Sequence, residues 1–523
     1  MTPVTPPLPL WVRIVDGLTV VAASLFLSNI LFDGFKLKVG DSRVTATSAI
    51  RTLIILLALI AIRHWRVRTP AIWTRLANWA VRTWHSPTTK LVVPAWAASR
   101  FAVLLTGYFA VIFIGFPGSG SPPFRISRNE LVNLPMRWDA GWYLGLALDG
   151  YSFRSGSGRQ ENVAFFPAYP MLTRVGASLL GAHGGMVKNT DGLNVAEFMY
   201  HQHRRIVLAG MFVSLGAFAW ALVYLFRLAR EMLGDEAAAG AVAMCCAYPF
   251  SLFYSAFYTE SVFLLTLVGT FYHFRRREWF AAAAWGLMLG LTRPNGCLIS
   301  IPLGLMALQQ SLEGGKANVW WRRGAFADEE KRSEHAGLEQ AGFTAPQDAG
   351  PVRFSMPRFI PAILVASMPG IGMLLFSAYL YSVSGNAFAW LEAHQAWGRV
   401  YEGVGGLFAG HAKLASELGV YEYTQRQPVD MVNSAATVVA LLLTWPVLRR
   451  IGLAYAVFLL LMLLPPLAAG GFMSMGRVTS TLFPLFLYLG WVLRGTSRSS
   501  IVTACAVLQG FFAALYWTWR PLF

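Results

Sequence analysis

The feature that most constrains this chain is a series of apolar runs, most of them close to 20 residues long. A helix needs about 20 apolar residues to cross the hydrocarbon layer of a membrane, so each run is a candidate transmembrane helix. Only 13% of the 523 residues are charged, whereas soluble domains typically carry about 25%. The chain is therefore predicted to be an all-α integral membrane protein with about 13 transmembrane helices, at residues 14–33, 48–63, 98–117, 205–228, 236–254, 258–275, 279–292, 296–312, 358–381, 431–448, 452–469, 478–494 and 500–519.

The net charge of +17 would suit a nucleic-acid-binding protein, but its distribution indicates a membrane. From Arg63 to Arg100 there are seven Lys or Arg and no Asp or Glu, directly after an apolar run. This is the pattern of a cytoplasmic loop, which retains positive charge. Its natural partner is an anionic headgroup. A membrane partner and no nucleic acid are expected.

A cytoplasmic position for this basic segment sets the predicted sidedness of the other loops. The N-terminus is then cytoplasmic, and the first apolar run is expected to be retained rather than cleaved, because no small-residue cleavage site follows it. If the spans alternate, the remaining basic clusters also fall inside: Arg227 with Arg230, Arg275 to Arg277, the charged loop 313–357, Arg449 with Arg450, and Arg494 with Arg498.

The predicted organisation is one membrane domain over residues 1–523 with two large outer loops, 118–204 and 384–430. The polar segment 313–357 is interpreted as a flexible cytoplasmic linker. The apolar stretch 163–181 lies inside the first outer loop and contains Pro167, Pro170 and Arg174. It is expected to dip into the membrane without crossing it.

The first outer loop contains an acid among aromatic residues. In a helix, Asp139, Trp142 and Tyr143 would share one face, with Trp138 beside them. Trp and Tyr favour the membrane–water boundary, where a lipid headgroup would meet a polar acceptor. Asp139 is therefore a candidate catalytic residue. The alternative is an aromatic belt in which Asp139 merely pairs with Arg137.

A second acid, Glu260, opens a span at the predicted outer face. Ionisable residues within a membrane are costly, roughly 2.5–3.5 kcal/mol at its centre, so Glu260 is a functional candidate. The alternative is an acid that stabilises the helix N-terminus. Arg293, Arg399 and Arg477 stand at predicted outer ends of spans. Their planar forks suit phosphate oxygens, although snorkelling to headgroups would also explain them.

The second outer loop carries an aromatic face formed by Trp390, His394, Trp397 and Tyr401. It is either a core-facing stripe or a platform for a sugar ring and a lipid phosphate. His394 has no clustered partners, so a zinc site is not expected. The four cysteines lie in apolar runs without metal-ligand spacing and are expected to pack as small apolar residues.

Several of these segments together resemble a known family, the mannosyltransferases of the GPI mannosyltransferase 2 (PIG-V) type, including their bacterial relatives. The resemblance is carried, in family order, by RWDAGWYLGLALDGY, AFFPAYP, FYSAFYTESVF, LTRPNG, HQAWGR and SMGRVTSTLFP. Asp139 stands at the motif acid and Glu260 at the second acidic position. Arg477 matches a Gly-Arg before the family's Phe-Pro, although Val478 replaces the usual Tyr. The first two spans and loop 313–357 lie outside the resemblance.

The resemblance implies the glycosyltransferase C architecture and a polyprenyl-phosphate sugar as donor, with mannose as the expected sugar. The acceptor would be a lipid or glycan at the outer face, and the membrane would be a bacterial plasma membrane. Asp139 would act as general base in a single inverting displacement, and arginines would stabilise the leaving phosphate. No cofactor is assigned, and a divalent cation bridging Asp139, Glu260 and phosphate oxygens stays open.

Other functions remain as alternatives. A lipid or sugar transporter would also have many spans, but it places charges near the bilayer midplane on broken helices, whereas the acids and arginines here gather at one predicted face. A structural scaffold would leave the aromatic and basic outer loops unexplained. Within the enzymes, another polyprenyl-phosphate hexose is the second choice of donor.

Overall fold

The computed structural model of the chain describes residues 8–32, 34–39, 42–118, 125–127, 129–153, 160–182, 195–313, 353–397 and 403–522. Within these ranges the regular structure is almost entirely helical. Two short antiparallel strand pairs are also present: β1, Phe35–Val39, pairs with β2, Ser42–Ala46, and β3, Leu312–Glu313, pairs with β4, Arg353–Phe354.

Each predicted span corresponds to one helix or to a pair of consecutive helices. The helices at these positions are α1, Leu10–Leu31; α2, Ala49–Arg66; α4, Pro87–Phe113; α8, Val195–Leu233; α9, Asp235–Ala247, with η2, Pro249–Ser255; α10, Glu260–Arg275; α11, Trp279–Gly290; η3, Pro294–Ile299, with α12, Ser300–Ser311; α14, Met356–Ala366, with α15, Met368–Ser384; α19, Pro428–Arg450; α20, Leu453–Gly470; α21, Met475–Ser480, with α22, Phe483–Val492; and α23, Gly495–Trp517.

Seven of these segments are long and apolar enough to cross a membrane, and an eighth is α9 with η2, bent by 76°. The all-helical membrane architecture is confirmed, whereas the count of 13 spans is not reproduced. Apolar windows in the sequence do not show where helices break, and α10, α11 and α22 have only 16, 12 and 10 residues. Helix α10 is nearly all buried, as expected for a helix that is apolar on every side.

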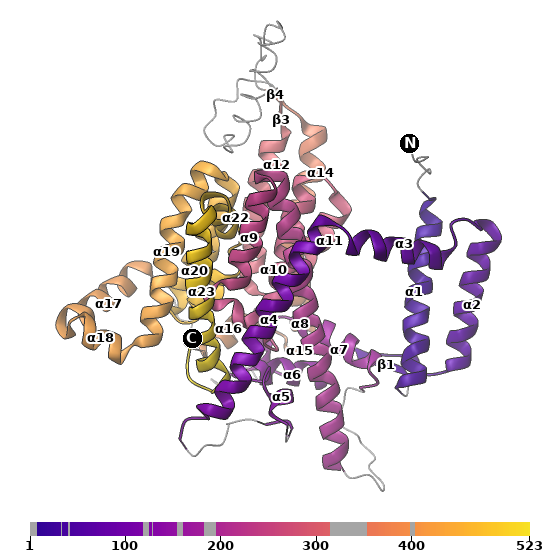
Figure 1. Ribbon diagram of the computed structural model, residues 1–523, viewed down its shortest axis with the longest axis horizontal. Coiled ribbons are helices and arrows are strands. Elements are labelled where there is room, and N and C mark those ends of the chain that lie inside the picture. Colours follow the sequence, from indigo (N-terminus) through magenta and orange to yellow (C-terminus); the bar gives the residue numbers. More distant parts are fainter. Residues whose placement is uncertain are drawn as a thin grey trace, which may run out of the picture.

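The bundle packs closely where small residues allow helices to approach. A Cβ added to Gly240 in α9 would lie 2.6 Å from the carbonyl oxygen of Gly490 in α22. A Cβ added to Gly107 in α4 would likewise clash with the indole of Trp517, at the end of α23. These contacts tie helices that are distant in the sequence into one body around α8 and α10 (Figure 1).

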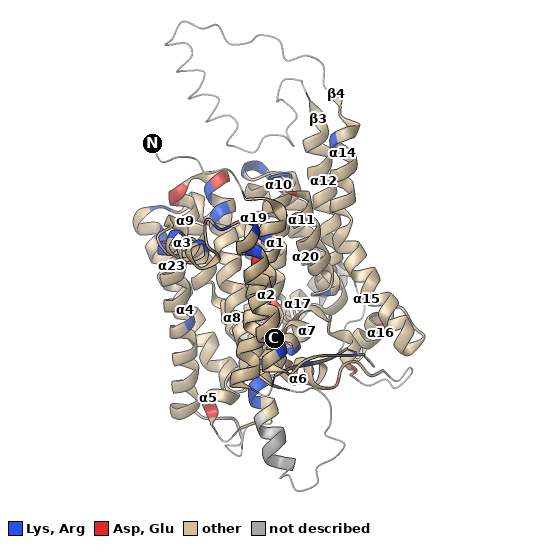
Figure 2. Cartoon of the chain, turned by 90° about the vertical axis from the view of Figure 1, so that its right-hand side faces the viewer, with Lys and Arg blue, Asp and Glu red and all other residues tan. Residues whose placement is uncertain are grey.

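The two ends of the bundle carry different elements. The strand pair β3–β4 and α3, Ile72–Trp84, lie at one end, whereas α5, Glu130–Asn133, and α6, Ala140–Leu148, lie at the other (Figure 1). The ribbon between the ends is mostly free of Lys, Arg, Asp and Glu (Figure 2). Helix α7, Ala168–Leu179, has 12 residues and is too short to span a bilayer.

The loops predicted from the sequence are described only in part. Residues 314–352 of segment 313–357 lie outside the described residues. The second outer loop holds α16, Ala389–Gln395, α17, Val404–Leu418, and α18, Val420–Arg426. The hairpin of α1 and α2 stands apart from the main bundle (Figure 1), which it joins through α3 and through packing of β1 on α7.

Candidate active site

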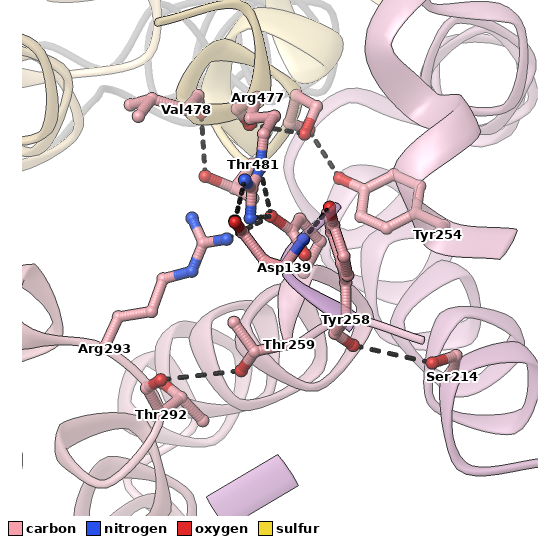
Figure 3. Close-up of polar contacts among 12 residues, drawn as sticks. Asp139, Ser214, Tyr254, Tyr258, Thr259, Thr292, Arg293, Arg477, Val478 and Thr481 are labelled. Carbon is pink, nitrogen blue, oxygen red and sulfur yellow. Dashed lines mark hydrogen bonds and ion pairs between the residues drawn. The ribbon is translucent and has the colours of Figure 1, made fainter. Parts of the chain in front are cut away.

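Four charged side chains from distant parts of the chain meet at the α6 end of the bundle (Figure 3). Nη1 of Arg477 donates to Oδ2 of Asp139 at 2.8 Å. Nε and Nη2 of Arg477 contact Oε1 of Glu260 at 2.8 and 2.7 Å. Arg293 also donates to Oε1 of Glu260. One carboxylate oxygen thus holds two guanidinium groups, and one of these groups also holds Asp139.

The chain conformation around Asp139 is set by its neighbours. Trp138 has a φ of 53°, which is unusual for a residue other than glycine and costs of order 1–3 kcal/mol. The N–H of Asp139 donates to Oη of Tyr258 at 3.1 Å, and that hydroxyl donates to the carbonyl oxygen of Arg137 at 3.1 Å. Tyr258, two residues before the start of α10, therefore holds the turn that places Asp139 next to Arg477.

Arg477 lies in α21, whose position is set by close packing. The N–H of Gly476 donates to Oδ1 of Asn433 at 2.6 Å, and a Cβ at Gly476 would lie 2.1 Å from the ring of Phe250. Cζ of Arg477 lies 4.6 Å from the ring centroid of Tyr258 and 5.3 Å from that of Phe253. Two carboxylates and two aromatic faces thus compensate a buried guanidinium.

Arg293 stands where the helical chain breaks. Helix α11 ends at Gly290 and η3 begins at Pro294, so Arg293 is extended, with a φ of −155°. The carbonyl oxygen of Leu291 accepts from the N–H of Ala168 at 3.0 Å, which fixes the break against α7. Among the described residues, Nε and Nη1 of Arg293 have no hydrogen-bond partner.

The cluster is closed at Glu260 and open at Asp139 and Arg293. Side-chain exposure is 0% for Glu260 and 9% for Arg477, but 20% for Asp139 and 13% for Arg293. The formal charges of the two acids and two arginines cancel. A ligand that enters from the exposed side would meet a carboxylate and a guanidinium. This combination can accept a proton and bind an anion.

The alternative pairing of Asp139 with Arg137 is wrong. Arg137 is fully buried and donates to the carbonyl oxygens of Trp517 at 2.8 Å and Asn133 at 2.6 Å. It also lies 3.6 Å from Glu130. Burial lowers the pKa of Arg137 to about 10, so it stays protonated at neutral pH. Arg137 joins the segment between α5 and α6 to the end of α23, a role that sequence reasoning missed.

Arg293 and Arg477 depart from their alternative, whereas the position of Glu260 agrees with both of its interpretations. Glu260 is in the first turn of α10, where an acid stabilises the helix N-terminus, and its Oε1 also pairs with Arg293 and Arg477. Its Oε2 is buried without a hydrogen-bond partner among the described residues. Arg293 and Arg477 point into the cluster, so snorkelling to headgroups does not describe them. All three residues were predicted as site residues because each is a charge at the end of an apolar run.

Aromatic side chains from the two loops that were predicted to face outward form a wall beside the cluster. The ring centroids of Trp142 and Trp397 are 5.6 Å apart, and each ring packs against Phe165. Tyr143 contacts Phe165 at 5.1 Å and Tyr258 at 6.0 Å, which connects this aromatic wall to the ring under Arg477. Nε1 of Trp397 is buried without a partner among the described residues. Phe165 belongs to the AFFPAYP stretch but was not predicted as a site residue.

The remaining predicted site residues have other surroundings or are not described. Trp138 packs on Trp519, with centroids 5.4 Å apart. Nδ1 of His394 lies 2.6 Å from the carbonyl oxygen of Trp390 in the same helix, α16. Arg399 lies outside the described residues, as does Tyr401. The described part of the chain contains no group of three His, Cys, Asp or Glu side chains that could hold a metal ion. The guanidinium of Arg477 lies between the two acids that were considered as ligands of a bridging cation.

Comparison with known proteins identifies the segment that carries most of this cluster. Residues 117–310 match the mannosyltransferase (PIG-V) family. This PIG-V segment includes Asp139, Glu260 and Arg293, whereas Arg477 and Trp397 lie beyond it. The family resemblance predicted from the motifs is confirmed over this segment.

Two similar proteins illustrate the extent of the resemblance. The PIG-V relative GPI alpha-1,6-mannosyltransferase 2 of Cricetulus griseus is 30% identical over 167 residues, which cover 32% of this chain and 30% of that protein. The chain therefore matches less than a third of this relative's length. A crystal structure of the Archaeoglobus fulgidus oligosaccharyltransferase tethered to an acceptor peptide is similar with a TM-score of 0.35 and 10% identity, over 81% of this chain and 55% of that one.

Proposed function

We propose that this protein is a mannosyltransferase that moves a hexose from a polyprenyl-phosphate sugar to a lipid or glycan acceptor. The observation that carries the proposal is the cluster of Asp139, Glu260, Arg293 and Arg477, three of whose members lie in the PIG-V segment. A partly exposed carboxylate beside a partly exposed guanidinium suits a hydroxyl acceptor and a phosphate leaving group. A glycosyltransferase C architecture, as the resemblance implies, fits this assignment.

Asp139 would act as the general base. Its Oδ2 is held by Arg477, whereas its Oδ1 has no hydrogen-bond partner among the described residues and is the oxygen left to take a proton. The acceptor oxygen forms a bond to the anomeric carbon as its proton passes to Asp139. The bond between that carbon and the phosphate oxygen breaks, and the polyprenyl phosphate leaves with the electron pair. A single displacement of this kind inverts the anomeric carbon.

Arg293 is the residue best placed to bind the donor phosphate. It is more exposed than Arg477 and has donors that no described residue uses, whereas Arg477 is shared between two carboxylates. A planar fork matches phosphate oxygens and stabilises the negative charge that develops on the leaving group. Arg399 in the second outer loop remains a further candidate for this role.

Glu260 would position both arginines without touching the substrate. Its Oε1 lies 2.7 Å from Nη2 of Arg477 and also accepts from Arg293, so it fixes the separation of two positive groups that would otherwise repel. With Glu260 ionised, the formal charges of the four-residue cluster sum to zero. A bound donor phosphate would then give the site a net negative charge.

The aromatic wall would form the platform for the sugar ring or the first prenyl unit. Trp142 and Trp397 come from different outer loops and meet edge to face, and Tyr143 continues the wall toward Arg477. The free indole N–H of Trp397 is a donor for a sugar hydroxyl. His394, one turn before Trp397, is a further candidate contact. We place the site at the outer face of a bacterial plasma membrane, with a cytoplasmic N-terminus.

The deciding experiment supplies purified protein with radiolabelled polyprenyl-phosphate mannose, glucose or arabinose and a lipid extract, and follows which label reaches a product. Mannose is expected to transfer. Asp139→Asn provides the inactive protein. Asp149→Asn is the matched control, because Asp149 ends the same helix α6 but is exposed and outside the cluster. Transfer of glucose or arabinose alone would correct the sugar, and labelled donor crossing vesicles without any product would identify a transporter instead.

A further inference from the structure

Helix α3 runs from the α1–α2 hairpin to the main bundle, on the side away from α5 and α6 (Figure 1). It connects the end of α2 to the start of α4 and runs roughly across the directions of both (Figure 1). Every residue of α3 except Ile72 and Arg75 is exposed. Because α3 packs so little against the rest of the protein, we expect contacts outside the protein to stabilise it.

The exposed surface of α3 has one apolar and one polar face. Trp73, Leu76, Ala80 and Trp84 recur at the spacing of one helix face. The side chains of Trp73 and Trp84 are 63% and 65% exposed. Indoles are favoured at the boundary between headgroups and hydrocarbon, where one side of the ring is apolar and the N–H is hydrated.

The polar face carries positive charge that is only partly neutralised. Arg75 on α3 and Arg63 on α2 both pair with Asp16 of α1, with Nε of Arg63 at 3.1 Å from Oδ1. This triad, in which Arg63 and Asp16 are buried and Arg75 is partly exposed, anchors α3 to the α1–α2 hairpin. Arg82 on α3, like Arg66 and Arg68 before it, forms no ion pair with a described residue, and the sequence has no acid from residue 63 to residue 100.

Three arginines, Arg66, Arg68 and Arg82, are therefore exposed cations without an ion-pair partner among the described residues. Cζ of Arg66 lies 5.5 Å over the ring of Trp65, itself 77% exposed. The exposed cations and indoles lie in the segment that connects two apolar helices, α2 and α4. That position is the level at which these helices would leave the hydrocarbon.

We propose that α3 is an in-plane interfacial helix that binds the anionic phospholipid headgroups of the leaflet on this side of the protein. Its indoles would enter the interface, and Arg66, Arg68 and Arg82 would contact lipid phosphates. Amphipathic helices with basic polar faces bind anionic lipid surfaces in this way. The inference concerns a lipid-binding surface on the side away from the cluster and does not depend on the glycosyl-transfer reaction.

The surface has a structural consequence for the N-terminal hairpin. Because the triad of Asp16, Arg63 and Arg75 fixes α3 to α1 and α2, lipid bound along α3 would also hold the hairpin at its correct depth. One end of the hairpin is held by the packing of β1 on α7, and the opposite end is attached to the bundle through α3. Anionic lipid should therefore change the environment of α3 itself.

The test places a spin label on α3 of the full-length protein in nanodiscs of phosphatidylcholine with increasing phosphatidylglycerol. Ala80→Cys reports the apolar face and Asn78→Cys the polar face, in a background in which Cys297 and Cys505 are Ser. The thiols of Cys245 and Cys246 are buried and out of reach of the reagent. Collisions with oxygen measure contact with lipid, and collisions with a nickel chelate measure contact with water.

We expect the label at residue 80 to collide with oxygen and the label at residue 78 with nickel, in a manner that depends on phosphatidylglycerol. Each arginine is worth about five-fold in affinity for an anionic surface, so replacing Arg66, Arg68 and Arg82 by Gln should weaken that affinity roughly 100-fold and abolish the phosphatidylglycerol dependence of the label at residue 80. The matched control replaces Arg227, Arg449 and Arg450 by Gln and should leave the label at residue 80 unaffected. Equal nickel collisions at both positions, or no effect of the α3 substitutions, would overturn the proposal.

Discussion

Asp139→Asn removes the negative charge and the proton-accepting oxygen of the proposed base without changing the size of the side chain. The amide cannot accept the acceptor proton, and removal of a general base typically lowers the rate by about 10²- to 10⁴-fold. The structure adds a second consequence for the donor. The carboxylate of Asp139, whose Oδ2 accepts from Nη1 of Arg477 at 2.8 Å, also places a negative charge beside the arginine cluster, and this charge opposes binding of the donor phosphate.

The effect on donor binding follows from the charges of the cluster. Asparagine changes the formal charge of the four-residue group from zero to +1. Two unit charges 4 Å apart interact by about 4 kcal/mol at an effective dielectric constant of 20, and less when one of them is exposed. Because Asp139 is 20% exposed and the phosphate lies farther away, a gain of about 1 kcal/mol is a reasonable expectation, or roughly five-fold tighter donor binding.

The assay measures turnover and donor affinity on the same purified variant, with Asp149→Asn as control. Lost turnover with equal or tighter binding of a polyprenyl-phosphate sugar is the expected result. Near-normal turnover would refute the base role of Asp139. Lost turnover together with weaker donor binding and a lower melting temperature would show that Asp139 holds Arg477 for structural reasons, which is contrary to this reasoning.

Four further predictions concern the cluster, the loop that carries it and the topology. Glu260→Gln should lower the free energy of unfolding by about 3–5 kcal/mol, measured by thermal unfolding, because the buried Arg477 and the partly exposed Arg293 lose their shared carboxylate; a stability change below 1 kcal/mol would contradict the positioning role. Arg293→Ala should weaken donor binding or turnover by about 2–5 kcal/mol, with only partial rescue by Lys, and normal kinetics would exclude it as the phosphate ligand. Arg137→Met should destabilise the protein by about 3–5 kcal/mol, whereas Arg125→Gln, which removes a 51% exposed partner of the same Glu130, should cost at most about 1 kcal/mol; equal melting temperatures would refute the anchoring role. Cysteines at Ser155 and Ser333 should label from opposite sides of the membrane, and equal labelling by an impermeant reagent would overturn the proposed sidedness.

Much of the candidate site was predictable because charges within apolar segments are rare. Asp139, Glu260, Arg293 and Arg477 were each identified from local context, and the motifs around the first three fall in the segment that matches the PIG-V family. The helical membrane architecture followed in the same way from long apolar runs. The number of spans did not, since a helix break at Pro294 or a bend between α9 and η2 is set by packing as well as by apolar length.

The sequence by itself determined which segments are apolar, where charges interrupt them and which side chains are candidates for chemistry. Only the tertiary structure decided how those side chains pair. Asp139 has Arg137 two residues away, yet it bonds to Arg477, 338 residues later. The reason is that Arg137 is buried among the carbonyl oxygens of Asn133 and Trp517, so its donors are directed away from Asp139. Such a choice depends on how α6, α21 and α23 pack, because a buried ion pair requires both partners to be desolvated together in one geometry.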